Sequence, residues 1–231
     1  MGYENLKPAL ERFSMTAGFI ASGGRRTETV FDLEDSFHDS PQMGACVERM
    51  KSDPAMGRLI SQGYTTPDFD LAELMRYPVG TLGHTYAKLL GTQGFNPHFY
   101  RDRPIKTDTD YCIMRVRKTH DIHHVVTGFG MVGGGELGVI GVTAYQYGYP
   151  AFAMIDLTAV ALAFQQAHGF QQAIDFVGAG IQMARACKPL MGARWEDGWD
   201  KPVASWRTEL GITPITSGPS SWYTSVPAAN D

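Results

Sequence analysis

The amino-acid sequence predicts an all-α fold of roughly eight to ten helices. Apolar residues recur at three- and four-residue spacing along much of the chain, which is the period of an amphipathic helix. Capping residues and glycines stand where these segments begin and end. The sequence lacks the alternation of apolar and polar residues that would indicate a sheet. No linker divides the chain before residue 213, so we expect one domain over residues 1–212 and a flexible, Pro/Ser-rich tail over 213–231.

The N-terminal half is predicted to form short helices. The first starts near Leu6 and ends at Gly23, with apolar residues at helical spacing between them. Asp53-Pro54 is a capping residue followed by a first-turn proline, and it starts a helix that ends near Gly63. Asp70 caps a further helix over residues 71–77. A break at residues 78–83 precedes a helix around Tyr86, Leu89 and Leu90, and residues 96–107 are a connector.

The C-terminal half is predicted to form longer helices in two pairs. Residues 110–128 and 135–149 make the first pair, separated by a glycine-rich turn. Residues 151–168 and 170–187 make the second pair, divided at Gly169 and closed by Pro189. A short helical piece carrying Trp195, Trp199 and Trp206 follows.

Composition limits the classes of function. The 231 residues are 43% hydrophobic and 19% charged, which is enough apolar content for a core and too little charge for disorder. A net charge of −4 argues against nucleic acid as the main partner. The longest apolar run, residues 151–164, is interrupted by Asp156 and is too short to span a bilayer.

The sequence also carries an expectation about compartment. It shows no basic-then-apolar signal segment and no Arg-rich transit peptide at its start. The three cysteines are isolated from one another, which favours reduced thiols in the cytosol.

One motif in the first helix pair gathers metal-ligand residues: His120, Asp121, His124 and, after eleven intervening residues, Glu136. On a helix, His124 lies one turn after His120 and about 40° around the axis, and it is within ligand reach of both His120 and Asp121, as i,i+4 and i,i+3 pairs. Imidazole nitrogens and carboxylate oxygens are ligands that Zn²⁺ or Fe²⁺ accepts.

The turn between the two helices explains how Glu136 joins this motif. Glycines in the run 127–135 end the first helix, and a second helix starts at Gly135. If the second helix folds back antiparallel, its first turn brings Glu136 beside His124. We predict one divalent ion held by His120, His124 and Glu136, with Asp121 in or next to the coordination shell. His123 lies on the other flank and is expected to be a neighbour.

Each of these residues also has an ordinary explanation. Two histidines four apart arise by chance, an Asp beside them can belong to a solvated face, and a Glu in a first turn is favoured by the helix dipole. Four residues of suitable type at compatible angles favour the metal site over those separate explanations.

The same region matches a dinucleotide fingerprint, with glycines at 128, 130 and 133 and Asp156 beyond them. That fingerprint needs a buried strand before it. The preceding segment 115–121 is too charged for a central strand, so we reject the nucleotide interpretation.

The second helix pair is apolar nearly all round and rich in small residues. Small residues permit close helix packing, which is one explanation. The other is a slot for a long apolar ligand, lined by Gly178, Ala179, Gly180 and Met183.

The chain resembles the Coq4 family of ubiquinone (coenzyme Q) biosynthesis proteins. The hallmark of that family, His-Asp-x-x-His-x11-Glu, is present without departure at residues 120–136. The resemblance covers roughly residues 43–212 and includes these segments: Met56-Gly-Arg-Leu-Ile, Tyr77-Pro-Val-Gly-Thr-Leu-Gly-His-Thr-Tyr, Arg115-Val-Arg-Lys-Thr-His-Asp, Lys188-Pro-Leu, Arg194-Trp-Glu and Trp206-Arg-Thr-Glu-Leu-Gly-Ile.

The resemblance implies an all-α protein, peripheral on a membrane, that holds a prenylated quinone precursor or other isoprenoid lipid beside a divalent ion. It implies removal of the C1 carboxylate from a polyprenylated hydroxybenzoate, with hydroxylation at that carbon, and contacts with other quinone-biosynthesis enzymes. Zn²⁺ is favoured and Fe²⁺ is allowed. Without a transit peptide we expect a bacterial member, cytoplasmic or on the cytoplasmic face of the inner membrane; a homodimer stays open.

Roles follow from the chemistry of the site. A divalent ion can act as a Lewis acid on a phenolate or carboxylate oxygen. Asp121 and Glu136 are the candidate catalytic residues, Asp121 as a base or as a partner that orients a histidine. Arg115 and Arg117 could bind an anionic head group, or they could form a solvated basic face.

Two alternatives remain. A zinc hydrolase with Asp121 as base predicts a polar cleft. A non-catalytic lipid-binding scaffold predicts four protein ligands that close a tetrahedron around the ion.

Overall fold

The computed structural model describes residues 6–23, 28–65, 67, 69–165 and 169–225. Within these ranges the chain is all-α, as predicted, and its only strand-like features are two isolated bridges, Thr81 with Pro202 and Phe129 with Ser221. The helices are α1 (Leu6–Ala21), α2 (Glu28–Phe37), α3 (Pro41–Ser52), α4 (Pro54–Gln62), α5 (Leu71–Leu74), α6 (Leu82–Gln93), α7 (Asp108–Thr127), α8 (Gly134–Tyr147), α9 (Pro150–Ala163), α10 (Gly169–Ala186), α11 (Val203–Leu210) and α12 (Trp222–Ser225), with a 3-10 turn, η2, at Trp195–Gly198.

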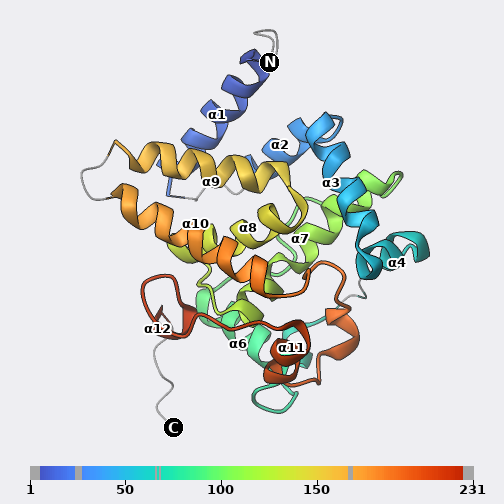
Figure 1. Cartoon of the computed structure of the whole chain (residues 1–231). Coiled ribbons are helices and arrows are strands. Elements are labelled where there is room, and N and C mark those ends of the chain that lie inside the picture. Colours follow the sequence, from blue (N-terminus) through green and yellow to red (C-terminus); the bar gives the residue numbers. More distant parts are fainter. Residues whose placement is uncertain (1–5, 24–27, 66, 68, 166–168, 226–231) are drawn as a thin grey trace.

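Helix α7 runs through the interior, and α3, α4, α6, α8 and α11 all contact it (Figure 1). Val116, Val125 and Val126 on α7 are fully buried. Helices α8, α9 and α10 pack on one another beside it (Figure 1). None of the described helices combines the length and the apolarity needed to cross a membrane. The central position of α7 places its histidines inside the protein.

Two helices, α2 and α3, lie outside the sequence-based expectation. The start of α3 carries a readable signal, because the Ser40 hydroxyl accepts a hydrogen bond from the Met43 amide and Pro41 occupies the first turn. Helix α2 also carries a readable signal, because Val30, Leu33 and Phe37 recur at helical spacing. It buries Phe31 and Glu34, and both residues line a pocket next to α7.

Glycines allow α10 to lie directly on α8. A Cβ atom at Gly180 would collide with the carbonyl oxygen of Gly138, and one at Gly138 would collide with the Phe129 ring. The small residues in this part of the chain therefore serve close helix packing. This corrects the expected slot at Gly180, because the backbone of α8 already fills the space beside it.

The C-terminal segment also differs from the prediction of a flexible tail from residue 213. As far as Ser225 it is docked on the turn that follows α7. The Ile215 amide donates to the Thr127 carbonyl, the Gly130 amide donates to the Ser220 carbonyl, and the Trp222 amide donates to the Gly128 carbonyl. Residues 226–231 of the predicted tail lie outside the described residues. The segment folds onto the protein because it satisfies backbone groups that the glycine turn leaves open.

Candidate metal centre

Helix α7 is fixed at both ends. A capping box formed by Thr107 and Asp110 starts it, and Gly128 in the left-handed conformation ends it. Arg207 of α11 donates to the carbonyls of Val125 and Val126 in its last turn, at 2.9 and 2.8 Å. The glycine turn that follows links one helix to another, which confirms that it is not a dinucleotide fingerprint after a strand.

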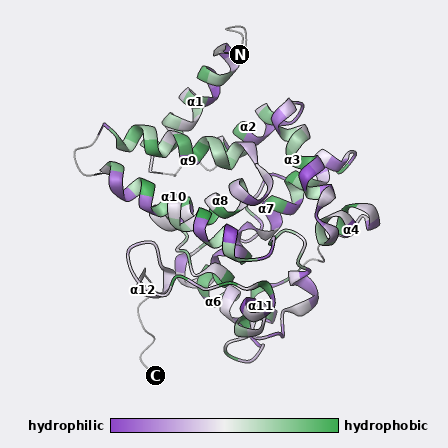
Figure 2. Ribbon diagram, in the orientation of Figure 1, coloured by the Kyte–Doolittle hydropathy of each residue, from purple (hydrophilic) through white to green (hydrophobic). Residues whose placement is uncertain are grey.

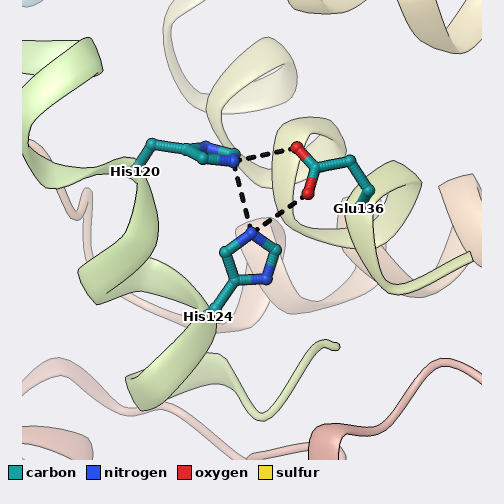
Figure 3. A group of neighbouring side chains, drawn as sticks. All are labelled: His120, His124 and Glu136. Carbon is teal, nitrogen blue, oxygen red and sulfur yellow. Dashed lines mark hydrogen bonds and ion pairs between the residues drawn. The ribbon is translucent and has the colours of Figure 1, made fainter. Parts of the chain in front are cut away.

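His120, His124 and Glu136 converge at the start of α8 (Figure 3). The Nε2 atoms of the two histidines lie 3.2 Å apart. The two carboxylate oxygens of Glu136 lie 2.9 Å from His120 Nε2 and 3.2 Å from His124 Nε2. Ligands about 2.0–2.1 Å from a tetrahedral ion are separated by about 3.3 Å, so the three side chains fit one Zn²⁺-sized ion.

A backbone contact orients His124. Its Nδ1 lies 3.0 Å from the Phe129 carbonyl oxygen, which can only accept a hydrogen bond. Nδ1 therefore carries the proton, and the lone pair of Nε2 faces the cluster. His123 lies on the other flank of α7, beside Trp195, as predicted.

The three groups shift one another's pKa values. Burial opposes ionisation of Glu136, but His120 and His124 outweigh it and hold the pKa of this carboxyl well below its usual range. Burial disfavours a charged His120, yet the Glu136 carboxylate outweighs burial and raises the pKa of His120 to about 9. A negative carboxylate between two imidazoles is an electrostatic arrangement that favours a cation.

Asp121 stands beside the three converging side chains and is not among them. It is half-buried, lines the same pocket and makes no hydrogen bond or ion pair with another described residue. Burial raises its pKa, although His120 and His124 act in the opposite direction. The carboxyl group is free to meet a ligand.

The converging residues lie at the wall of a pocket of about 580 Å³. Beyond the polar cluster its lining is mostly aromatic and aliphatic, with contributions from α1, α2, the loop after α6, the turn before α8, and α9. These residues include Phe19, Val30, Phe31, Phe95, Phe99, Tyr100, Met131, Val132, Ile140, Phe152 and Ile155. The sequence contains no local signal that these separate segments share a pocket.

The two arginines proposed to bind a head group are engaged by the protein itself. Arg115 is buried, donates to the carbonyls of Met191 and Ala193, and pairs with Glu196. It does not line the pocket. Arg117 does line the pocket, but it pairs with Glu34 at 2.7 Å and donates to the Arg101 carbonyl. We therefore assign both guanidinium groups a structural role, in place of the expected substrate contact.

Glu34 is a charged residue of the pocket that the sequence analysis did not identify. Its carboxylate accepts hydrogen bonds from the Arg117 guanidinium and from the Tyr149 hydroxyl, both at 2.7 Å. Burial raises its pKa, and Arg117 opposes this shift. The three side chains bind α2, α7 and the start of α9 together behind the pocket.

The predicted ligand contacts on α10 lie elsewhere. Gly178, Gly180 and Met183 do not line the pocket. Gly180 packs on α8, and Met183 is part of the core. Of the second helix pair, α9 alone contributes to the pocket, through Phe152 and Ile155.

Comparison with known proteins identifies relatives. The family model described as coenzyme Q (ubiquinone) biosynthesis protein Coq4 matches residues 22–216. A mitochondrial ubiquinone biosynthesis protein COQ4 from Eremothecium gossypii is 30% identical over 170 residues, which cover 71% of this chain and 51% of that protein. Its counterpart from Vanderwaltozyma polyspora is 29% identical over 199 residues, 84% of this chain and 55% of that protein. The chain thus spans about half the length of these relatives.

A solved structure is also similar. A crystal structure from Nostoc punctiforme, provisionally named a ubiquinone biosynthesis protein, superposes with a TM-score of 0.80. It is 28% identical in sequence, and the match covers 90% of this chain and 99% of that one.

Proposed function

The chain belongs to the Coq4 family of coenzyme Q (ubiquinone) biosynthesis proteins, and from this premise we propose that it is a metal-dependent protein acting on a polyprenylated hydroxybenzoate at ring carbon C1. The observation that carries the proposal is the meeting of two features in one pocket. His120, His124 and Glu136 supply three converging ligand atoms, and aromatic and aliphatic side chains line the space next to them.

The protein residues have separate tasks in this proposal. His120, His124 and Glu136 hold the divalent ion, Zn²⁺ by preference and Fe²⁺ as the alternative. When bound, the ion supplies Lewis acidity to an oxygen of the aromatic head group. The free carboxylate of Asp121 accepts the proton of a ring hydroxyl, and the apolar lining excludes water from the reacting carbon.

The reaction breaks the bond between C1 and its carboxyl carbon, so that CO₂ leaves and the electron pair stays on the ring. A proton fills C1 in simple decarboxylation. Hydroxylation at C1 instead needs an oxidant of the dioxygen class. The isoprenoid tail occupies the apolar part of the pocket, where each methylene removed from water contributes about 0.8 kcal/mol to binding.

In a direct test, the metal-loaded protein is incubated with a prenylated hydroxybenzoate, and loss of the carboxyl group is followed by mass spectrometry. Asp121→Asn should keep the metal and the bound lipid and lose turnover by about 100-fold or more. His124→Ala should lose the metal as well, which elemental analysis measures. Unchanged metal content in His124→Ala would remove the proposed metal site.

The alternatives predict other outcomes. A scaffold binds the lipid and the ion but converts nothing, even with an oxidant present. A zinc hydrolase with Asp121 as base requires a polar cleft, and the mostly apolar lining of the pocket disfavours this alternative. Contacts with other quinone-biosynthesis enzymes remain part of the proposal, supported by the pathway to which the family belongs.

A further inference from the structure

One segment of the chain forms part of the pocket wall without belonging to a helix. Residues 95–100 follow α6, and Phe95, Asn96, Phe99 and Tyr100 of this segment line the pocket. Phe95 and Phe99 are also 39% and 45% exposed, so these side chains border both the pocket and the solvent. We refer to residues 95–100 as the flap. The flap is thus a boundary between the interior of the pocket and the solvent.

Both ends of the flap are attached to helices. Gly94, which ends α6, has a positive φ of 69°, and the Phe95 amide donates to the Leu90 carbonyl. At the other end, the Arg101 carbonyl accepts a hydrogen bond from the buried Arg117 guanidinium. The Arg101 side chain pairs with three carboxylates of α2, which are Glu28, Asp32 and Asp35 at 3.1, 2.9 and 3.1 Å. Two fixed ends, one of them at a glycine, are the arrangement of a hinged segment.

Side-chain contacts hold the middle of the flap in place. The ring of Phe99 packs on the ring of Phe31 from α2, with centroids 5.9 Å apart. The Nε2 atom of the exposed His98 lies 3.3 Å from the Phe69 carbonyl oxygen, and the centroids of the two rings are 5.2 Å apart. Contacts of this kind are weak compared with the packing of a buried helix. They can break and re-form while the helices at both ends stay folded.

The flap and α9 together enclose an apolar space. Helix α9 supplies Phe152 and Ile155 to the pocket, and most of this helix is coloured as hydrophobic in Figure 2. A closed flap keeps water away from these walls. A long apolar ligand must enter at an exposed boundary, and the flap and the rim at Val132, which is 61% exposed, are two such places.

The turn that carries Val132 is fixed by its surroundings. The Gly130 amide donates to the Ser220 carbonyl, and a Cβ atom at Gly134 would collide with the Phe176 ring. Motion of this turn would also displace the Phe129 carbonyl that orients His124. Opening of the flap requires no movement of the three converging side chains, which favours the flap as the entrance.

We propose that the flap is the gate of the pocket: it turns about Gly94 and Arg101 to admit an apolar ligand, and the contact between Phe99 and Phe31 closes it again. A gate changes the association and dissociation rates of a ligand together, whereas a residue that only lines a pocket changes mainly the dissociation rate. The proposal requires an apolar ligand in the pocket and no particular reaction, so it goes beyond the proposed function.

Stopped-flow binding of dansyl-labelled farnesol, whose emission rises in apolar surroundings, measures both rates on the full-length protein. Phe99→Ala removes the closing contact and should raise the association and dissociation rates about tenfold each. Val79→Ala is the matched control, because it shortens an apolar side chain that is 85% exposed and lies away from the pocket. Both rates of the control should equal those of the wild type.

A reversible cross-link tests the motion directly. The native cysteines are buried, so Phe99→Cys with the exposed Asp32→Cys places one reactive thiol on the flap and one on α2. A short bifunctional methanethiosulfonate should join them and slow both rates about tenfold or more, and dithiothreitol should restore both. Each single-cysteine variant, treated in the same way, shows the effect of the adduct without the link.

Equal rates in the cross-linked and the released protein would overturn the proposal, and a change of both rates in Val132→Ala would then place the entrance at the turn before α8. A change in the dissociation rate alone would show a lining without a gate. Absence of probe binding by the wild type would also overturn the proposal, because the flap would have nothing to admit. The rates are measured without added metal, so failure of the metal site and failure of the gate are distinguishable.

Discussion

The two histidines of the candidate centre are held to different degrees. His124 is buried and its Nδ1 is committed to the Phe129 carbonyl, whereas the buried Nδ1 of His120 has no hydrogen-bond partner among the described residues. The His120 ring is held through its Nε2 edge by Glu136 and His124 and packs against the ring of Phe152. In the proposed metal site, His120 is therefore the residue whose proton would compete with the ion.

Metal affinity should depend on pH through His120. Its pKa is raised to about 9, so the imidazole is protonated at neutral pH and must release one proton when the ion binds. Between about pH 8 and pH 6 the affinity should fall about tenfold per pH unit. Calorimetric titration with Zn²⁺ in buffers that differ in their heat of ionisation measures the number of protons released on binding. A pH-independent affinity would contradict this assignment.

Asp156 is a buried carboxyl at the crossing of α8, α9 and α10. Its Oδ1 has no hydrogen-bond partner among the described residues, and burial followed by the nearby Glu136 raises its pKa to about 8. The folded protein keeps this proton up to that pH, whereas the unfolded chain releases it near pH 4. Stability should therefore fall as pH rises between these two values.

Asp156→Asn removes the ionisable carboxyl and with it this pH-dependent loss of stability. The variant should be more stable than the wild type by on the order of 1 kcal/mol or more at about pH 8, and the difference should shrink toward about pH 4. Denaturant unfolding across this pH range measures it. The exposed Asp175→Asn is the matched control and should change the slope little. An equal slope in the wild type and Asp156→Asn would contradict the expectation.

At the scale of elements, α8 and α10 cross in close contact, and two glycines of α10 differ in their relation to this crossing. A Cβ at Gly180 would strike the backbone of Gly138, whereas a Cβ at Gly178 would meet nothing within 4 Å. The two positions are two residues apart on one helix, so they form a matched pair. Packing, and not ligand binding, decides the residue at position 180.

Gly180→Ala should destabilise the protein by about 1–3 kcal/mol, because backbone cannot move aside as a side chain can. Gly178→Ala should be neutral or stabilising by up to about 1 kcal/mol, since alanine favours the helix. Thermal unfolding compares the two variants. If both variants lost stability, or if neither did, the close packing of α10 on α8 would not explain the glycine at position 180.

At the scale of the whole molecule, distance along the chain decides what the sequence could predict. His120, His124 and Glu136 belong to two consecutive helices joined by one turn, so helical period and that turn were sufficient to predict their convergence. The pocket walls come from α1, α2, the loop after α6 and α9, and no local pattern reports that these elements meet. Arg117 resembled a head-group ligand because its partner Glu34 lies 83 positions away.

The C-terminal segment is the part of the chain where the interpretation of composition differs most from the structure. Its Pro, Ser and Gly residues suggest a tail, but they also suit an irregular segment that hydrogen-bonds to the turn at residues 128–130. We refer to this docked segment, residues 213–225, as the strap. Composition reports the lack of regular structure in a segment, and it does not report docking. The strap supports the same turn whose Phe129 carbonyl orients His124.

Removing the strap should therefore weaken the metal site at a distance. A chain ending at Ile212 should bind Zn²⁺ about tenfold more weakly and unfold at a lower temperature. A chain ending at Ser225 keeps the docked residues and should match the full-length protein. Zn²⁺ titration and thermal unfolding measure both, and a normal affinity in the shorter chain would show that the turn holds its shape alone.

His120, His124 and Glu136 lie on two consecutive helices, α7 and α8, and this placement has a consequence for the order of folding. Closing a short loop costs little chain entropy, whereas joining α1, α2 and α9 around the pocket requires contacts of high sequence separation. The three side chains can thus converge early in folding, from α7 and α8 alone. An ion bound at this stage would stabilise the pairing of the two helices while the rest of the chain folds. The apolar walls of the pocket come together only when these distant elements have packed, so under the proposed function the protein would acquire its ion before its lipid.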